Sequence, residues 1–381
     1  MTTPNDPKMH RRHLLGAAAA APLALPTRQA GTSQQLGRPE ALQGRPTLVG
    51  SANCLAGMKK HYEALTSGAR PLDVAIEVVK IVEADPNDMS VGLGGLPNEE
   101  GTVTLDAAVM DGATHNAGSV SHIENILHPV EVARLVMERT DHVQLVGQGA
   151  YEFARMHGHP HAELLTEQAR KVWLKWKETM SERDDRLVPA GPAADKQDKD
   201  KNGQLIRYMG REVAVADLAS KKRLTGTIHC SALSSTGTIA CCTTTSGLAW
   251  KIPGRVGDSS AIGAGLYCDA GAGSAGATGR GEAAILSAGS AMIVEQLRQG
   301  RAPVDAGMEI LRRITEQAQR AAVWQPGLVD EAGIPSFNIQ FYVLGLDGQV
   351  AGVELLERGH RYAVADEAGG PRLETLVGLH G

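Results

Sequence analysis

Two runs of strand-forming residues joined by a short turn constrain the fold most. Along residues 227–234, Thr, His, Ser and Leu alternate with Ile, Cys and Ala, which places the two sets on opposite faces of a strand. A turn sequence, Ser-Thr-Gly, follows at 235–237, and residues 238–245 are a second run rich in threonine. The pattern predicts an antiparallel hairpin in which Thr227 lies opposite Thr245. Threonine pairs well across any sheet, so this pair alone does not identify a site.

Helical and strand patterns alternate along the rest of the chain. Helices are expected at residues 55–65, 71–83, 130–139, 149–157, 282–298 and 303–320. Strands are expected at residues 46–51, 102–110, 142–146, 338–346, 349–355 and 362–365. With the central hairpin, this order predicts two sheets sandwiched between layers of helices in one compact domain, without internal repeats.

The composition limits both the core and the partners. Only 3% of the residues are aromatic, whereas 44 of the 381 are glycine, so the core must be built from Ala, Val, Leu and Ile. The formal net charge is -5 and the isoelectric point is near 6.2. These values leave no broad basic face, so nucleic acid is not expected as a partner.

The first thirty residues have the pattern of a targeting segment. Residues 10–15, HRRHLL, form a twin-arginine pattern, and the apolar run at 16–25 is too short to span a bilayer as a helix. We therefore expect residues 1–30 to be a twin-arginine signal that is removed near Ala24 or Ala30. The mature protein is then expected in the periplasm or outside the cell, without stable membrane insertion. An alanine-rich leader with no signal function is the alternative.

The five cysteines predict buried free thiols. They are odd in number and have no CxxC spacing: Cys54, Cys230, Cys241, Cys242 and Cys268. A disulfide framework or a zinc site is not expected, although an exported protein meets an oxidising compartment. The cysteine pair at 241–242 has no neighbouring base, so it is not expected to supply a thiol nucleophile.

Two short patterns match ligand-binding motifs, but the sequence around each of them does not fit such a site. Residues 271–276 fit GxGxxG, but residues 265–270 before them do not form the apolar strand that a dinucleotide-binding unit requires. The histidine-rich HGHPH at 157–161 is expected to be an exposed helix end rather than a metal site. We therefore expect no cofactor and no metal.

Two long gapped motifs in the right order resemble a known family. Residues 90–120, SVGLGGLPNEEGTVTLDAAVMDGATHNAGSV, are similar to its SVGxGGxPxxxGxxxLDAxxMDG segment, and residues 226–281 carry GT before the hairpin, then TTTSG, GRVGDS and ATGRG. The chain resembles bacterial glycosylasparaginases, which are N-terminal-nucleophile hydrolases of the type 2 asparaginase family. The resemblance extends from about residue 47 to 375 and is weaker between 175 and 223. The resemblance implies an α+β fold, a four-layer αββα sandwich.

The resemblance also implies that the chain cleaves itself. A threonine hydroxyl is a poor nucleophile without a nearby base, and a free α-amino group, with a pKa of about 7.7 to 8.0, can be that base. Thr227 lies mid-chain, so its amine exists only after the Gly226–Thr227 bond is cut. Family members of the human type have Asp where this chain has Gly226. Glycine suits this position because it tolerates the strained backbone that attack on its carbonyl requires.

Self-cleavage would divide the chain into an upstream subunit, 31–226, and a downstream subunit, 227–381. Residues 177–222 are polar and mixed in charge, with RDDR, GPAADKQDKDKNG and KK, which predicts a mobile surface segment. A loop this long inside a compact domain usually has a function. Here it would be the tail of the upstream subunit.

Carried over by matching positions, the resemblance implies a pocket for an amino acid. Arg255 would hold the substrate α-carboxylate through bidentate hydrogen bonds, which lysine cannot form. Asp258 would accept a hydrogen bond from the substrate α-ammonium. Thr245 and the backbone N–H of Gly279 would donate to the developing oxyanion.

Three further residues complete the implied site. Thr278 and Gly281 would line the pocket, and Ser90 would help to orient the nucleophile. Two simpler interpretations remain open. Arg255 and Asp258 could form a surface ion pair worth under about 1 kcal/mol. Ser90 could cap a turn.

One feature of many family members is missing. They carry a tryptophan just after the first strand, in an NTW-like motif that shapes the substrate pocket. This chain has Ser-Ala-Asn-Cys at 51–54, and similar bacterial sequences also have a SAN stretch. Asn53 or Cys54 is therefore expected in that wall.

The implied activity is hydrolysis of the side-chain amide of N4-(β-N-acetylglucosaminyl)-L-asparagine, through a β-aspartyl ester on Thr227. An isoaspartyl peptidase/L-asparaginase with the same mechanism is one alternative. An uncleaved, non-catalytic periplasmic protein that binds amino-acid derivatives is another. The family implies that cleaved pairs assemble as dimers.

Overall fold

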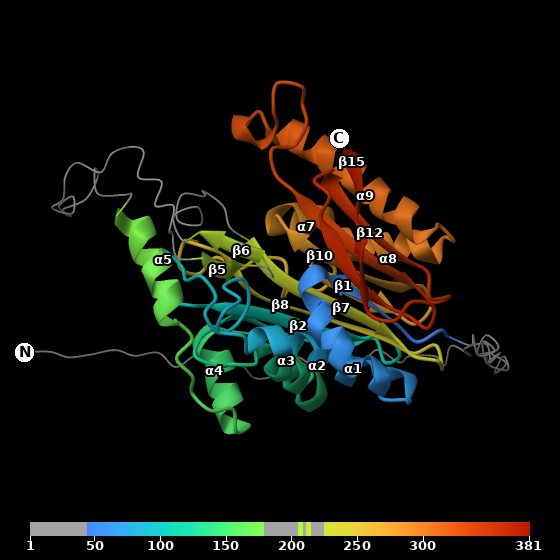
Figure 1. The fold of residues 1–381 in the computed structure, drawn as a ribbon, viewed down its shortest axis with the longest axis horizontal. Helices are drawn as coiled ribbons and strands as arrows, with labels where there is room; N and C mark the ends of the chain where they lie inside the picture. Colours follow the sequence, from blue (N-terminus) through green and yellow to red (C-terminus); the bar gives the residue numbers. More distant parts are fainter. Residues whose placement is uncertain (1–43, 179–204, 209–210, 215–224) are drawn as a thin grey trace, which may run out of the picture. The chain divides into compact units, whose positions relative to one another are not determined.

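The predicted hairpin lies at the centre of an eight-stranded sheet (Figure 1). Strands β7 (Thr225–Leu233) and β8 (Ile239–Leu248) pair antiparallel, and Ile228 pairs with Thr244, which is the predicted register. The sheet order is β14-β13-β1-β7-β8-β2-β3-β4. Its other strands are β1 (Thr47–Ser51), β2 (Leu105–Asp111), β3 (Asn116–Ile123), β4 (Gln144–Val146), β13 (Arg361–Ala365) and β14 (Arg372–Thr375).

The computed structural model describes residues 44–178, 205–208, 211–214 and 225–381, which belong to one compact unit spanning residues 41–381. The expected signal segment and most of the polar stretch 177–222 lie outside the described residues. Within that stretch, β5 (Leu205–Tyr208) and β6 (Arg211–Ala214) pair as a two-stranded sheet. In the described ranges, every helix is too short or too polar to cross a bilayer.

A second sheet of five strands packs on the first, in the order β15-β12-β11-β10-β9. Its strands are β9 (Leu266–Asp269), β10 (Gly273–Gly279), β11 (Ile339–Gly345), β12 (Val350–Leu356) and β15 (Val377–His380). Val49 and Cys241 of the first sheet meet Leu266 and Tyr342 of the second in the layer between them. All five cysteines are buried, as predicted.

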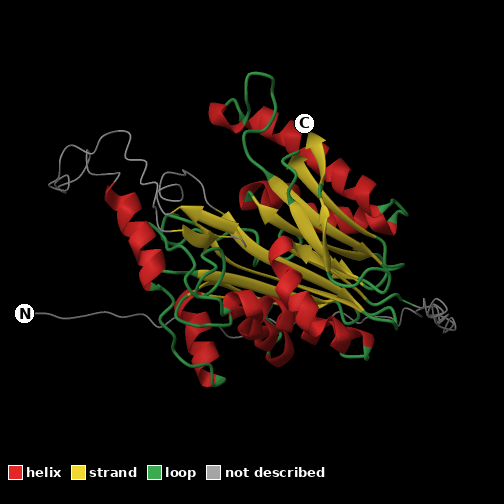
Figure 2. Cartoon of the chain, in the orientation of Figure 1, coloured by secondary structure: helices red, strands yellow, loops and turns green. Residues whose placement is uncertain are grey.

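Helices cover the outer face of each sheet, which gives the four-layer αββα sandwich (Figure 2). The first sheet is covered by α1 (Leu55–Thr66), α2 (Pro71–Glu83), α3 (Pro129–Arg139) and α4 (Gly147–Met156). The second is covered by α7 (Gly281–Ser287), α8 (Gly289–Arg298) and α9 (Pro303–Ala321). Because both faces of each sheet are buried, neighbouring residues such as Leu48 and Val49 enter different apolar layers.

One predicted helix differs in the structure, and one strand was not predicted. The single helix expected at 282–298 was wrong, because Ala288 takes a left-handed conformation, φ 50°, that ends α7 before α8 begins. The glycine-rich stretch that forms β10 was not predicted as a strand. A Cβ on Gly276 would lie 2.0 Å from Nδ1 of the buried His229, so the close approach of the two sheets requires glycine there.

A further helix, α5 (Glu167–Glu178), was also missed by the sequence patterns. It packs in a small apolar cluster in which the rings of Trp176 and Trp250 stack with centroids 5.0 Å apart. The HGHPH segment follows α4 directly, and His157 and His161 are exposed, as expected of a helix end.

Candidate active site

Thr227 lies at an irregularity in the central hairpin. The register between β7 and β8 shifts between Gly226 and Ile228, so that two residues of β8, Thr245 and Ser246, lie opposite the single residue Thr227. Its hydroxyl donates to the Thr245 hydroxyl at 3.3 Å, as the predicted pairing requires. Thr245 in turn donates to the carbonyl oxygen of Gly226 and accepts from the N–H of Gly247 at 2.7 Å. The two threonines thus meet at the carbonyl of the Gly226–Thr227 bond.

Gly226 packs directly on the backbone of Ser90. A Cβ at position 226 would lie 2.2 Å from the Ser90 Cβ and 2.3 Å from its carbonyl oxygen, so no larger residue fits without a shift. The Ser90 hydroxyl donates to the carboxylate of Asp88, and the Ser90 carbonyl accepts from Ser246 at 2.9 Å. Ser90 therefore packs against Gly226, while its N–H and its hydroxyl are both held by the carboxylate of Asp88.

Asn53, which was expected in the pocket wall, contacts Thr227 but is not among the residues that line the cavity described below. Its side-chain amide donates to the carbonyl oxygen of Thr227 at 3.3 Å. Its own oxygen accepts from the Ser51 hydroxyl at 2.6 Å. Cys54 is fully buried and its thiol donates to the carbonyl of His229 at 3.0 Å. Of the two expected residues, it is Asn53 that contacts Thr227.

Arg255 is held by a residue that the sequence did not point to. Its Nε and Nη2 both donate to Oε1 of Glu282, at 3.2 and 2.8 Å. Among the described residues, the ion pair of Arg255 is therefore with Glu282, 27 positions away, and not with Asp258. The side chain is 19% exposed, so a ligand can reach it, but a ligand that uses Nε and Nη2 must displace Glu282.

Asp258 is buried beside the start of α7. A Cβ on Gly281 would lie 2.5 Å from Oδ1 of Asp258, so the structure brings these two predicted residues into contact. Burial raises the pKa of the Asp258 carboxyl to about 7, even though nearby Arg255 acts to lower it. A ligand ammonium would offset this burial and favour the charged carboxylate.

Thr278 lies on β10 and, like Thr227, lines the cavity described below. Its hydroxyl is 2.8 Å from the hydroxyl of the buried Tyr342 and donates to Oε1 of Gln340 at 3.2 Å. The next residue, Gly279, has φ 110°, a conformation that favours glycine. The backbone turns away from regular strand geometry there.

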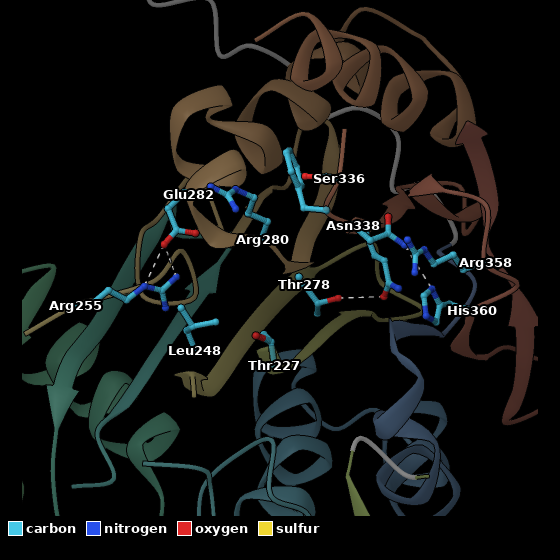
Figure 3. A pocket seen from close by; sticks show the side chains of 13 residues that line it. Thr227, Leu248, Arg255, Thr278, Arg280, Glu282, Ser336, Asn338, Arg358 and His360 are labelled. Carbon is cyan, nitrogen blue, oxygen red and sulfur yellow. Dashed lines mark hydrogen bonds and ion pairs between the residues drawn. The ribbon is translucent and has the colours of Figure 1, made fainter. Parts of the chain in front are cut away.

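These side chains surround a cavity of about 500 Å³ (Figure 3). It is lined by Thr227, Leu248, Arg255, Thr278, Gly279, Arg280, Glu282, Ser336, Phe337, Asn338, Gln340, Arg358 and His360. A small recess joins Thr227, Thr245, Asp258 and Gly279. In Figure 3, Thr227 and Thr278 lie between Arg255 with Glu282 on one side and Arg358 with His360 on the other.

Two buried ionisable residues near the cavity were missed. Lys251 donates to the carbonyl oxygens of Thr104 at 3.0 Å and Ser246 at 2.7 Å, and burial lowers its pKa to about 8. Asp106 accepts from the N–H of Gly257 at 3.3 Å, just before Asp258. Asp106 belongs to the LDA motif, so the sequence did contain a signal for Asp106. Nothing in the sequence around Lys251 indicated that Lys251 is buried.

The geometry suits a particular kind of chemistry. A guanidinium and a buried carboxyl can hold an α-carboxylate and an α-ammonium, which places the side chain of a bound amino acid toward Thr227. Hydroxyl-bearing side chains gather at that point, and the sandwich around them is the fold of N-terminal-nucleophile hydrolases. The class is that of hydrolases acting on linear amides.

Comparison with known proteins gives the family. The sequence profile of the family described as asparaginase, Asparaginase_2, matches residues 45–324, and the chain belongs to this family. The chain is 36% identical over 314 residues, 82% of its length and 79% of the relative's, to an N(4)-(β-N-acetylglucosaminyl)-L-asparaginase of Elizabethkingia miricola. It is 34% identical over 267 residues, 68% of its length and 75% of the relative's, to an isoaspartyl peptidase/L-asparaginase of Xenopus laevis.

Proposed function

We propose that this chain is a self-processing amidohydrolase that cleaves the side-chain amide of asparagine derivatives. The observation that carries the proposal is the contact of the Thr227 and Thr245 hydroxyls at the carbonyl of Gly226. It supplies a nucleophile, an electrophile and a hydrogen-bond donor at one point. The same point opens into the cavity that Arg255 lines.

Self-cleavage begins with attack of the Thr227 oxygen on the carbonyl carbon of Gly226. The Thr245 hydroxyl donates to the carbonyl oxygen as it becomes negative. The C–N bond then breaks, the nitrogen takes up the proton that the Thr227 hydroxyl has lost, and the upstream chain is transferred to the Thr227 oxygen as an ester. Water hydrolyses this ester, which frees the carboxylate of Gly226 and the α-amine of Thr227.

Substrate hydrolysis repeats this chemistry with the new amine as the base. The amine of Thr227 takes the hydroxyl proton, and the oxygen attacks the side-chain amide carbon. Thr245 and the N–H of Gly279 donate to the oxyanion. The leaving amine departs with the proton, and water hydrolyses the β-aspartyl ester.

Binding of the aspartyl half falls to the residues around the recess. Arg255 takes the α-carboxylate and Asp258 the α-ammonium, while Thr278 and Gly281 shape the wall. Ser90 positions the scissile bond through its backbone contact with Gly226. The side chain of Arg255 must exchange Glu282 for the substrate carboxylate.

N4-(β-N-acetylglucosaminyl)-L-asparagine is the first candidate substrate, since it is named for the relative from Elizabethkingia miricola. A β-aspartyl peptide is the second candidate. It is favoured by the guanidinium of Arg358, which lines the cavity on the side of Thr227 away from Arg255 (Figure 3). We further propose export through the twin-arginine signal to the periplasm and assembly of the cleaved pairs as dimers.

The test is the state of the Gly226–Thr227 bond. We would measure the intact mass and N-terminal sequence of the purified protein beside a Thr227→Ala variant. Two pieces, one beginning Thr-Ile-His-Cys, together with an uncut variant would support the proposal. A single uncut chain in both samples, stable over days, would instead indicate a non-catalytic protein that binds amino-acid derivatives.

A further inference from the structure

Lys251 is a buried cation behind the recess that Thr227 and Thr245 line. The residue is 3% exposed, and its ammonium group donates to two backbone carbonyl oxygens, those of Thr104 at 3.0 Å and Ser246 at 2.7 Å. Burying an ammonium group is costly, so a lysine that only filled this space would be less favourable than an apolar residue of similar size. A cation kept here despite this cost indicates a role in the neighbouring site.

One peptide unit connects Lys251 to Thr245. The carbonyl oxygen of this unit belongs to Ser246 and accepts from Nζ of Lys251 at 2.7 Å. The N–H of the same unit belongs to Gly247 and donates to Oγ1 of Thr245 at 2.7 Å. The Thr245 hydroxyl donates in turn to the carbonyl oxygen of Gly226. These groups form one chain of hydrogen bonds in which each donor points from the ammonium group toward the scissile carbonyl.

A cation at the start of such a chain strengthens the bonds further along it. A hydrogen bond to the carbonyl oxygen polarises the peptide unit, which makes its N–H a stronger donor to Thr245. The Thr245 oxygen also accepts from Thr227 at 3.3 Å, so both of its lone pairs are occupied and its hydrogen is directed to Gly226. A stronger and better oriented donor matters most when the carbonyl oxygen becomes negative.

We propose that Lys251 is a positioning residue for the oxyanion donor: through the 246–247 peptide it orients and strengthens the Thr245 hydroxyl, in self-cleavage and in substrate hydrolysis. The inference rests on the proposed function and adds a residue to its mechanism. A Cβ on Gly247 would lie 2.9 Å from Nζ of Lys251, yet Lys251 is not among the residues that line the cavity or the recess. It acts through the peptide and makes no contact with the substrate.

The charge of Lys251 changes within the range of pH where the enzyme can be assayed. Burial lowers its pKa to about 8, while the titratable groups that face it act in opposite directions: Asp106 of β2 raises the pKa and Arg255 of its own loop lowers it. Lys251 is therefore charged below about pH 8 and neutral well above it. The uncut chain has no free amine at Thr227, so the pH dependence of self-cleavage reports on Lys251 without that group.

The experiment is a double-mutant cycle on the rate of self-cleavage. We would follow the uncut fraction of freshly synthesised full-length chain by intact mass, for the wild type, Lys251→Met, Thr245→Val and the double variant. Methionine keeps the unbranched apolar stem of lysine and removes the charge. Lys59→Met, at an exposed position of α1, is the matched control. Thermal unfolding would verify that each variant is folded. If methionine prevents folding, Lys251→Gln takes its place, since it can still donate to Ser246 but without charge.

Lys251→Met should slow self-cleavage at pH 7 by roughly tenfold, as expected for the loss of one charged hydrogen bond. The cleaved variant should lose kcat on L-asparagine to a similar extent, with KM little changed. In the Thr245→Val background the same substitution should have little further effect, because the chain of hydrogen bonds is already broken. The advantage of the wild type over Lys251→Met should shrink as the pH rises above about 8, and Lys59→Met should behave as the wild type.

Three results would overturn the inference. The first is a Lys251→Met variant that cleaves itself as fast as the wild type. The second is a full further loss in the Thr245→Val background, and the third is a loss that does not vary with pH, since a merely structural role produces both. Each of these leaves the proposed function standing, because the wild type still cleaves itself. A wild-type chain that neither cleaves itself nor hydrolyses L-asparagine or another asparagine derivative refutes the proposed function, and the inference with it.

Discussion

The Thr245 hydroxyl donates a hydrogen bond to the carbonyl oxygen of Gly226. In the proposed mechanism, this donor serves two reactions in succession. It first polarises the carbonyl of the bond to be cut. When the carboxylate of Gly226 has left, the substrate amide takes the vacated position and meets the same donor. The uncut chain therefore already displays how a substrate carbonyl would sit against Thr227.

Removal of this donor should slow self-cleavage. Thr245→Val keeps the shape of the side chain but removes the hydroxyl, and we expect the rate to fall by about 10²–10³-fold, as for the loss of one oxyanion donor. The measurement is the uncut fraction over time, followed by intact mass. Thr245→Ser is the control, since it retains the donor. A valine variant that processes as fast as the serine variant would show that the contact has no catalytic role.

Any side chain at position 226 should displace the backbone around the Gly226–Thr227 bond. Gly226→Ala places a Cβ 2.2 Å from the Ser90 Cβ, so we expect little or no self-cleavage. The double variant with Ser90→Gly should not recover, because the Ser90 carbonyl oxygen would still be only 2.3 Å away. Gly149→Ala, where nothing lies within 4 Å, is the matched control. Normal processing of Gly226→Ala would contradict the steric argument.

Asp258 should make the protein less stable as the pH rises through the acid range. Its pKa is raised from 3.8 to about 7 in the folded state, so between these values the folded chain binds a proton that the unfolded chain does not. The free energy of unfolding contributed by this group therefore falls as the pH goes from about 4 to 7. Asp258→Asn should be more stable than the wild type at pH 8, by up to a few kcal/mol, and the difference should shrink at pH 5. Urea unfolding at both pH values measures it.

The same variant should lose activity, because the neutral amide cannot balance the substrate ammonium. A large drop in kcat/KM with self-cleavage intact is the expected result. For the wild type, kcat/KM should decline below about pH 7 as Asp258 becomes protonated. A variant with unaltered stability at pH 8 would mean that the carboxyl is not penalised by burial.

Glu282 should compete with the substrate for Arg255. Both donors of the Arg255 fork that point to Glu282 are needed by an α-carboxylate. Glu282→Gln holds the guanidinium less strongly, so we expect KM to fall by roughly threefold to tenfold with kcat little changed. Glu295→Gln, which alters an exposed pair with Arg298, is the control. An increase in KM would instead assign Glu282 to substrate binding.

Sequence patterns predicted the centre of the molecule well, for a physical reason. The alternation in β7 and β8 has a period of two, which sends each set of residues to its own face, and the short turn at 235–237 fixes the register that brings Thr227 to Thr245. Arg255 and Asp258 were found through motifs in which spacing and residue type are jointly constrained. Both lie at the cavity or its recess.

What the sequence could not reveal depends on distant parts of the chain. Glycine normally indicates a turn, yet Gly276 lies in a strand because His229 of another sheet occupies the space of its side chain. The partner of Arg255 is Glu282, which no local pattern connects to it. The buried Glu354 accepts four hydrogen bonds from two separate segments, which meet only in the folded sheet.

The interleaving of strands has a consequence for the cleaved protein. Strand β7 lies between β1 and β8, and β8 lies beside β2, so the eight-stranded sheet alternates between segments from either side of the Gly226–Thr227 bond. Two polypeptides joined in this way cannot part without losing the sheet. Their unfolding is also a dissociation, and refolding becomes a bimolecular encounter. After cleavage, the midpoint of unfolding should therefore depend on protein concentration, whereas that of an uncut monomer should not.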